Sequence, residues 1–280
     1  MLTPALAFVA VFIAYPLLRG FYKSFFDYNG GNVDRFVGMK NYIELFNDPA
    51  VLPSFVNVFW LTVALMLNQV GVAFIAAWLI HHLRSARLQY AFRIVVMVPA
   101  VVPTIVGFLI WSQFLSVDGA VNRILGALGA EWLIGNWLGD PDRVIIGLIL
   151  VGLPWLNGIN CLLFLAGLEN IPGERYEAAR LDRASRWQIL RYMEIPAVLP
   201  QMIVLGVLAV VLSLQSYENV YVLTGGGPFD SSNVPGLLLF KNAFTYGRFG
   251  YANAIGVLLV VVIAVILLAG RMLGRGGEDR

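Results

Sequence analysis

The sequence predicts an all-α integral membrane protein with six transmembrane helices. Of its 280 residues, 59% are hydrophobic and only 13% are charged, and the mean hydropathy is +0.76. A chain of this composition has too few polar side chains to cover its apolar surface in water, so a lipid bilayer is its expected solvent. Apolar segments also recur along the chain at the length of roughly 20 residues that a spanning helix needs.

Six apolar segments are long enough to span. We expect them at residues 2–21, 55–80, 91–115, 144–167, 198–223 and 252–273. Pro99 and Pro103 lie four positions apart in the third segment and predict a bend there. Prolines are tolerated in a membrane helix, because neighbouring helices can satisfy the backbone groups that a proline frees. The first segment lacks the basic region and cleavage site of a signal peptide, so we expect a membrane helix. Residues 1–280 are expected to form a single transmembrane domain.

Composition argues against several classes of function. A net charge of +2 does not indicate nucleic-acid binding, and the single cysteine, Cys161, allows no intrachain disulfide. His81 and His82 are adjacent and are the only histidines, so they cannot share a helix face as metal ligands four positions apart do. None of the three lysines stands in the Gly-Lys-Ser/Thr context of a phosphate-binding loop: Lys23, Lys40 and Lys241. We therefore expect no enzyme, no metal site, no cofactor and no ATP site in this chain.

A charged loop at residues 169–197 separates the fourth and fifth apolar segments. Pro172 and Gly173 are typical of the start of a first short helix. Ser185 followed by Gln188 has the spacing of a capping box and predicts a second, which should end before Pro196. Five of the 19 basic residues lie in this loop: Arg175, Arg180, Arg183, Arg186 and Arg191.

The distribution of basic residues predicts the orientation. If the loops alternate, eight Lys and Arg lie on one side in long loops, and eleven lie on the other side in shorter connections. Cytoplasmic connections carry the excess of positive charge. The charged loop and both termini are therefore expected in the cytoplasm.

Polar side chains within the apolar segments predict a substrate path, because such groups are costly in lipid and tend to face a cavity or another helix. A sugar needs amide and carboxylate partners for its hydroxyls and aromatic faces for its C–H surfaces. The candidates are Asn157, Asn160, Gln215, Tyr217, Glu218, Asn219, Tyr251 and Asn253. The alternative role is hydrogen bonding between helices, which we favour for Asn68 and Gln69.

Several motifs resemble one family of transporters. The charged loop contains Tyr176-Glu177-Ala178-Ala179, then Asp182, Ala184, Gln188, Ile195-Pro196 and Pro200. This pattern resembles the E-A-A loop of the permease subunits of ABC importers. Five further segments resemble the carbohydrate-uptake permeases of this family. They are Gly38-Met39-Lys40-Asn41-Tyr42 with Phe46; Trp111, Phe114, Gly119 and Asn122; Leu223-Thr224-Gly225-Gly226-Gly227-Pro228; Ala243-Phe244; and Gly250-Tyr251-Ala252.

The resemblance implies a type I ABC importer permease fold in a bacterial or archaeal cytoplasmic (inner) membrane. Its substrate would be an oligosaccharide, sugar or polyol derivative. Its partners would be a second homologous permease, two copies of an ATP-binding cassette subunit that bind ATP and Mg, and an extracytoplasmic substrate-binding protein. The residues implied in ATPase coupling are Tyr176, Glu177, Ala178, Ala179, Leu181 and Asp182.

Arg183 and Gly225–Gly227 are two sites where the backbone conformation matters. The family usually has glycine where this chain has Arg183, and arginine in a left-handed conformation costs on the order of 1 kcal/mol. Gly225–Gly227 is interpreted as a flexible external turn rather than a phosphate loop, because no strand precedes it and no lysine follows it.

Two other functions stay open at this point. An ion-coupled secondary transporter usually needs ionisable residues in mid-membrane or inverted repeats, and only Glu218 is a candidate acid here. A membrane-embedded enzyme would need reactive side chains that this chain lacks.

Overall fold

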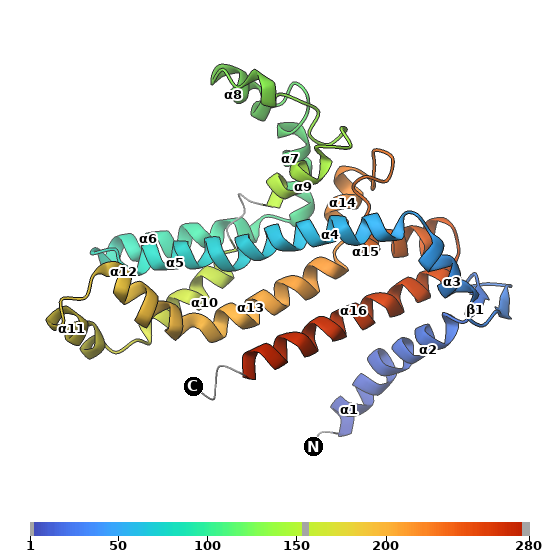
Figure 1. The fold of residues 1–280 in the computed structure, drawn as a ribbon, viewed down its shortest axis with the longest axis horizontal. Coiled ribbons are helices and arrows are strands. Elements are labelled where there is room, and N and C mark those ends of the chain that lie inside the picture. Colours follow the sequence, from blue (N-terminus) through green and yellow to red (C-terminus); the bar gives the residue numbers. More distant parts are fainter. Residues whose placement is uncertain (1–2, 153–156, 276–280) are drawn as a thin grey trace. The chain divides into compact units, whose positions relative to one another are not determined.

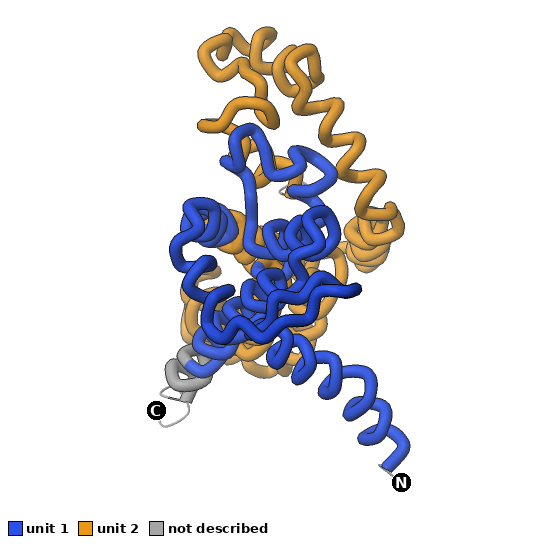
Figure 2. The backbone as a smooth tube through the Cα atoms, turned by 90° about the vertical axis from the view of Figure 1, so that its right-hand side faces the viewer, with its two compact units in different colours: residues 1–59, 214–280 blue, residues 60–213 orange. Residues whose placement is uncertain are grey.

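The computed structural model describes residues 3–152 and 157–275. Within these ranges the chain is mostly helical, and it contains a two-stranded sheet (Figure 1). The chain divides into two compact units, residues 1–59 with 214–280 and residues 60–213, which Figure 2 distinguishes by colour. Each unit contains a packed apolar cluster of its own.

The first unit combines the N-terminal and C-terminal parts of the chain. Its N-terminal elements are α1 (Thr3–Val9), the π turn η1 (Ala10–Ala14), α2 (Tyr15–Lys23), β1 (Phe26–Tyr28), β2 (Asp34–Phe36), α3 (Lys40–Asn47) and the start of α4 (Val51–Met66). Its C-terminal elements are α14 (Glu218–Leu223), α15 (Pro235–Phe240), the π turn η6 (Lys241–Thr245) and α16 (Phe249–Arg275). The first three elements form one continuous helix, Thr3–Lys23.

The hairpin of the first unit is fixed against the start of α16. Phe26 pairs with Phe36 in the antiparallel register, and their ring centroids lie 5.3 Å apart. A Cβ atom on Gly250 would lie 1.9 Å from the carbonyl oxygen of Phe26. Glycine is therefore required at this position, because any side chain would push the hairpin away from α16.

The second unit contains the remaining helices. They are the rest of α4, the π turn η2 (Leu67–Val72), α5 (Ala73–His81), α6 (Ala86–Met97), η3 (Val98–Val101), α7 (Thr104–Phe114), α8 (Ala120–Ala127), η4 (Glu131–Leu133), α9 (Val144–Gly152), α10 (Gly158–Glu169), α11 (Gly173–Leu181), α12 (Arg186–Ile189), the π turn η5 (Leu190–Glu194) and α13 (Ile195–Gln215).

The core of the second unit lies between α5 and α10. Ala73 and Ala77 are completely buried on α5, as is Phe164 on α10. The small alanines allow the two helices to approach closely, and the rings of Phe74 and Phe164 pack edge to face with centroids 5.8 Å apart. Together with α6 and α13, these helices form one continuous apolar cluster.

The described residues contain four helices long and apolar enough to cross a membrane: Thr3–Lys23, Val51–His81, Arg186–Gln215 and Phe249–Leu268. A fifth span exists if Ala86–Val101 and Thr104–Phe114, which are bent by 88° at their break, count as one. The bend predicted from Pro99 and Pro103 is thereby confirmed. The predicted span 144–167 is represented by α9 and α10, and residues 153–156 between them lie outside the described residues. The described part of the chain thus gives four or five candidate spans where the sequence predicts six.

The predicted span 198–223 is not one helix. α13 ends at Gln215 and α14 begins at Glu218, with Tyr217 between them at φ −142°. The start of α15 packs against this break, since a Cβ atom on Gly236 would lie 3.2 Å from the carbonyl oxygens of both Gln215 and Ser216. This contact joins segments that no local sequence pattern brings together.

The predicted end of the second loop helix before Pro196 is also wrong. α12 continues through η5 into α13, so that Arg186–Gln215 is one helix of 30 residues. Proline removes one N–H donor from the helical ladder. The π turn ends at Glu194, two positions before Pro196. In a π turn the regular α-helical hydrogen bonds of the backbone are already interrupted.

Apolar side chains cover much of the exposed surface. None of the residues in the most apolar stretch of Thr3–Lys23 is buried. Leu6, Phe12 and Leu18 are each more than 60% exposed. Surfaces of this kind face lipid or another protein chain.

Candidate functional site

The predicted coupling residues lie on an exposed helix. No residue of α11 is buried, and Glu177, Ala178 and Asp182 beside or within it are exposed. Leu181 is 85% exposed at the end of α11, and Trp187 on α12 is 64% exposed. Apolar side chains of this size gathered on a charged loop are typical of a surface that binds another protein.

The end of α11 has the hydrogen bonds of a Schellman motif. The N–H of Ala184 donates to the carbonyl oxygen of Ala179 at 2.9 Å, and the N–H of Arg183 donates to that of Arg180 at 3.1 Å. Arg183 adopts φ 53°, the left-handed conformation that glycine favours. The turn therefore keeps the geometry for which glycine is suited, with arginine in its place.

The second helix of the loop begins with the predicted capping box. The Ser185 hydroxyl accepts from the N–H of Gln188 at 3.3 Å, and the Ser185 N–H donates to Gln188 Oε1 at 2.7 Å. Both bonds satisfy backbone donors that would otherwise be unpaired at a helix start.

A buried carboxyl group links this loop to α5. Glu194 is 0% exposed. Trp78 Nε1 donates to its Oε2 at 2.8 Å, the Tyr176 hydroxyl donates to its Oε1 at 3.1 Å, and His82 Nε2 lies 3.2 Å from the same Oε1. Burial raises the pKa of Tyr176, and the neighbouring Glu194 carboxyl raises it further, so the phenol stays a donor at physiological pH.

Glu194 and Trp78 were not among the residues predicted from the sequence. The available signal was the position of Glu194 as the only acid between Asp182 and Glu218, two residues before Pro196. Nothing local indicated that its partner Trp78 lies 116 positions earlier.

In the second unit, amide side chains from two helices meet. Asn160 Nδ2 and Asn157 Nδ2 donate to Gln69 Oε1 at 2.9 and 3.3 Å. Asn157 also caps α10 by accepting from the N–H of Asn160 at 3.1 Å. Asn68 Nδ2 donates to the carbonyl oxygen of Gly152 at 2.7 Å. Asn68 and Gln69 thus bond to other helices, as expected, and the two predicted path residues Asn157 and Asn160 are bonded to Gln69.

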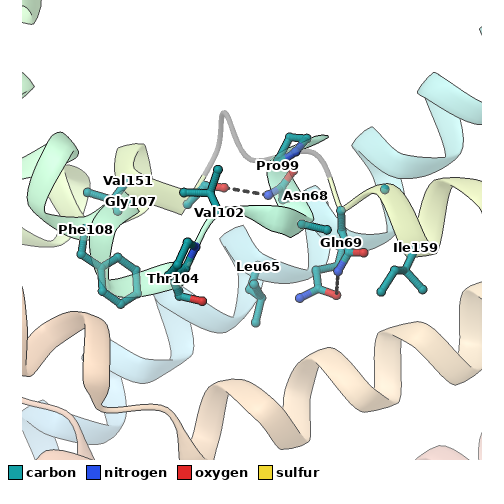
Figure 3. Close-up of a pocket in the computed structure, with 15 residues that line it drawn as sticks. Leu65, Asn68, Gln69, Pro99, Val102, Thr104, Gly107, Phe108, Val151 and Ile159 are labelled. Carbon is teal, nitrogen blue, oxygen red and sulfur yellow. Dashed lines mark hydrogen bonds between the residues drawn. The ribbon is translucent and has the colours of Figure 1, made fainter. Parts of the chain in front are cut away.

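A cavity of about 340 Å³ lies beside this amide cluster (Figure 3). Its polar lining includes Asn68, Gln69, Thr104 and Asn157, while Pro99 and Phe108 contribute apolar walls. The break between η3 and α7 opens this space, because the chain turns at Val102 and Pro103. The mixture of amides, a hydroxyl and an aromatic ring could bind a polyhydroxylated ligand.

The predicted path residues 215–219 cluster around the break after α13. Gln215 and Glu218 are exposed, and Glu218 opens α14, where an acidic side chain is favourable. Tyr217 stacks on Phe240 with centroids 4.9 Å apart, and Ser216 Oγ donates to Asn219 Oδ1 at 3.4 Å. Because the helix is interrupted here, these side chains lie around a break and not along the continuous span 198–223 that the sequence predicted.

Tyr251 and Asn253 lie on α16, away from this break in sequence. Tyr251 is 2% exposed, its hydroxyl donates to Asp48 Oδ2 at 2.7 Å, and the Arg248 guanidinium lies 4.5 Å from its ring centroid. Asn253 is half-buried, and its Oδ1 would lie 3.4 Å from a Cβ atom on Gly20. In this structure Tyr251 therefore holds α16 to the end of α3.

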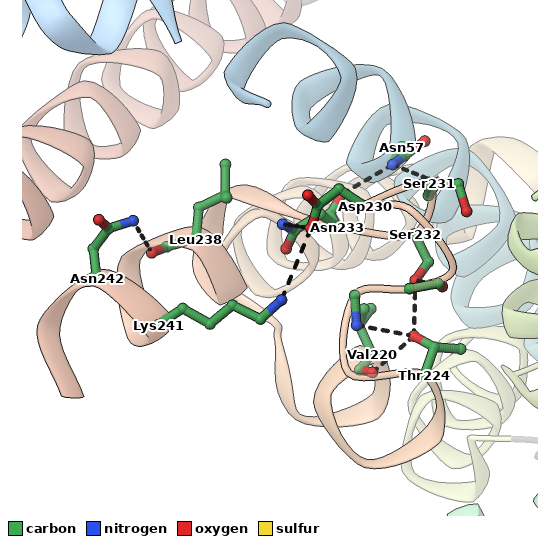
Figure 4. Close-up of polar contacts among 12 residues, drawn as sticks. Asn57, Val220, Thr224, Asp230, Ser231, Ser232, Asn233, Leu238, Lys241 and Asn242 are labelled. Atoms are coloured by element: carbon green, nitrogen blue, oxygen red, sulfur yellow. Dashed lines mark hydrogen bonds and ion pairs between the residues drawn. The ribbon is translucent and has the colours of Figure 1, made fainter. Parts of the chain in front are cut away.

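The Thr224–Asn233 loop forms hydrogen bonds within itself and to α4 (Figure 4). Asn57 Nδ2 on α4 donates to the carbonyl oxygens of Ser231 and Asn233, both at 2.9 Å. The hydroxyls of Thr224 and Ser232 lie 2.8 Å apart, and Ser232 is 0% exposed. Gly225 and Gly226 have φ 62° and 89°, a conformation that glycine adopts without the Cβ penalty.

In the part of the chain that the structure describes, no group of three or more His, Cys, Asp or Glu side chains is placed to hold a metal ion.

Comparison with known proteins identifies a family. Residues 69–276 match the family described as "Binding-protein-dependent transport system inner membrane component". The chain is 31% identical over 281 residues to the probable ABC transporter permease protein YurN of Bacillus subtilis, covering 99% of this chain and 96% of that protein. It is also 31% identical over 258 residues to the multiple sugar-binding transport system permease protein MsmF of Streptococcus mutans, covering 91% and 87%.

A solved structure has the same fold. It is the crystal structure of a bacterial ABC transporter involved in the import of the acidic polysaccharide alginate. One of its chains superimposes with a TM-score of 0.85 at 22% identity, covering 98% of this chain and 93% of that chain.

Proposed function

The chain belongs to the inner-membrane components of binding-protein-dependent transport systems, and from this membership we propose that it forms half of the translocation path of a carbohydrate importer. It is a permease subunit of an ABC importer, and ATP is hydrolysed by a separate subunit. In the proposed complex it pairs with a second, homologous but different permease, with two copies of the ATPase and with an extracytoplasmic binding protein. The proposed arrangement is one domain, residues 1–280, with six spanning helices.

One observation carries the proposal that this chain docks on a separate ATPase subunit: α11 is an exposed helix without a buried residue. A helix without a fully buried side chain gains little from packing within its own chain and is expected to gain more from a partner. Small side chains at Ala178 and Ala179 would let the ATPase backbone approach closely. Glu177, Leu181 and Asp182 complete this docking face, and Tyr176 anchors the helix to its own chain.

The proposed substrate class rests on chemistry and on relatives. MsmF is named as a sugar permease, and the alginate importer shares the fold. In this chain, Gln215, Tyr217, Glu218 and Asn219 offer amide, carboxylate and aromatic groups around an interrupted helix. The amide-lined cavity with Asn157 at its edge offers a second polar stretch. The sequence-based proposal also includes Asn160, Tyr251 and Asn253.

Alternating access would then follow from the docking of the ATPase on α11. ATP-driven closure of the ATPase subunits would bring the two coupling helices together and open the cavity towards the binding protein. Family membership removes the ion-coupled secondary transporter from consideration, because energy in this family comes from ATP.

The docking role of α11 is tested by Ala178→Trp. An indole at this exposed position would hold the two backbones apart and should abolish copurification of the ATPase, while the permease pair remains inserted. The measurement is the amount of ATPase recovered with a tagged permease, together with ATP-driven uptake in vesicles.

The matched control is Ala127→Trp at the end of α8, where an exposed alanine lies outside the charged loop. This variant should retain the ATPase. Normal ATPase recovery and uptake in the Ala178→Trp complex would remove α11 from the interface.

A further inference from the structure

Glu194 is an ionisable side chain enclosed entirely by protein. It is 0% exposed and is among the largest fully buried side chains of the described residues. A buried carboxyl group is costly unless its oxygens receive hydrogen bonds. Its position at the end of η5, within the charged loop and directly before α13, is not explained by docking of an ATPase on α11.

Both oxygens of Glu194 receive donors from elements far apart in sequence. Oε2 accepts from Trp78 Nε1 on α5 at 2.8 Å. Oε1 accepts from the Tyr176 hydroxyl on α11 at 3.1 Å and lies 3.2 Å from His82 Nε2. His81 Nε2 is 3.3 Å from the same Tyr176 hydroxyl. Three segments, the end of α5, α11 and the start of α13, therefore meet at one carboxyl group.

Tyr176 is the polar link of α11 to the core of the second unit. It packs against the apolar cluster between α5 and α10, and its hydroxyl is the point where α11 joins the Glu194 group. A force applied to the exposed face of α11 would reach α5 most directly through this phenol. Without the bond, α11 would remain joined to α13 by the turn at Arg183.

We propose that Glu194 is a positioning residue for energy coupling, whose buried carboxyl group holds α11 to the His81 end of α5. Displacement of α11 by the ATPase then moves α5 together with α13. This inference rests on the proposed docking of the ATPase at α11, and it adds the element that receives the movement.

The inference is tested by measuring whether α11 and α5 move as one body. Spin labels at Glu174→Cys on α11 and Leu79→Cys on α5 occupy exposed positions, while the native Cys161 is completely buried. The complete complex is measured at rest and after trapping with MgATP and vanadate. With Tyr176 and Glu194 intact, we expect the same distance distribution in both states.

Tyr176→Phe removes only the hydroxyl that Glu194 accepts from. In this variant we expect the trapped state alone to show a shifted or second distance population. Tyr192→Phe is the matched control, because Tyr192 is 72% exposed, and it should behave as the unmodified complex. If the Tyr176→Phe complex does not assemble, Trp78→Phe removes the hydrogen bond that α5 donates to Glu194 Oε2. It leaves His82 beside Oε1 and should shift the distance in the same direction.

Two results would overturn the inference: a distance that changes on trapping in the unmodified complex, or an unchanged distance in Tyr176→Phe and Trp78→Phe. Failure of the unmodified complex to bind the ATPase or trap vanadate would instead contradict the proposed function.

Discussion

Among single residues, Arg183 holds a conformation that its side chain disfavours. Its φ of 53° places it in the left-handed region, where a Cβ atom is crowded by the backbone. The bonds around it complete the Schellman motif that ends α11. This strain lies in the turn that connects α11, the proposed coupling helix, to α12. The end of α11 is therefore less stable than it would be with glycine at this position.

Replacing Arg183 with glycine should stabilise the end of α11 by about 1 kcal/mol, because glycine adopts positive φ without the Cβ penalty. The measurement is amide hydrogen exchange of α11 in the purified complex, which should slow by about five-fold. Arg180→Gly is the control, since glycine inside the exposed helix should speed exchange by a similar factor. Equal exchange in all three proteins would show that backbone strain at residue 183 does not limit this helix.

Residue-level prediction from sequence succeeded where the partners are neighbours in the chain. The capping box at Ser185 and Gln188 is a local pattern, and the structure contains both of its bonds. Glu194 was missed because its partners are Trp78 and His82, and no local pattern brings these positions together.

At the level of elements, the Thr224–Asn233 loop depends on one side chain from another helix. Asn57 on α4 donates two hydrogen bonds to loop carbonyls, and these bonds fix a segment that has little regular structure of its own. The glycines supply the positive φ values that let the chain turn, and Asn57 supplies the attachment.

Asn57→Ala should release this loop. Each lost hydrogen bond is worth about 1 kcal/mol, so the local free energy of opening should fall by about 2 kcal/mol. Hydrogen exchange across residues 224–233 should then speed up more than ten-fold. Asn47→Ala is the control, because Asn47 Nδ2 donates to Ile43 of its own helix in an exposed position. Unchanged loop exchange in Asn57→Ala would mean that the loop is held by its internal bonds alone.

Elements were predicted well as apolar segments and less well as continuous helices. The bend before α7 was predicted from Pro99 and Pro103, because the proline ring itself disrupts a helix and needs no distant partner. The break after Gln215 lies against Gly236, and the helix continues through Pro196 directly after a π turn. Neither is visible in composition or periodicity. The conformation of residues 224–233 likewise required knowledge of Asn57.

For the whole molecule, the distribution of arginine predicts the side on which the ATPase binds. A cysteine at Glu174 on α11 should resist an impermeant thiol reagent in intact cells and react after the membrane is opened, because the charged loop is expected in the cytoplasm. Arg35→Cys on the exposed β2 strand should react in intact cells and serves as the external control. Labelling of the Glu174 cysteine from outside would reverse the proposed orientation.

The central claim is that this permease imports a carbohydrate with energy from a partner ATPase. The most direct measurement is uptake, into vesicles, of the sugar carried by the cognate binding protein, using the complete complex with and without ATPase subunits. We expect uptake that requires internal MgATP, the ATPase and the binding protein together. Uptake driven by an ion gradient in vesicles that lack the ATPase would contradict the account.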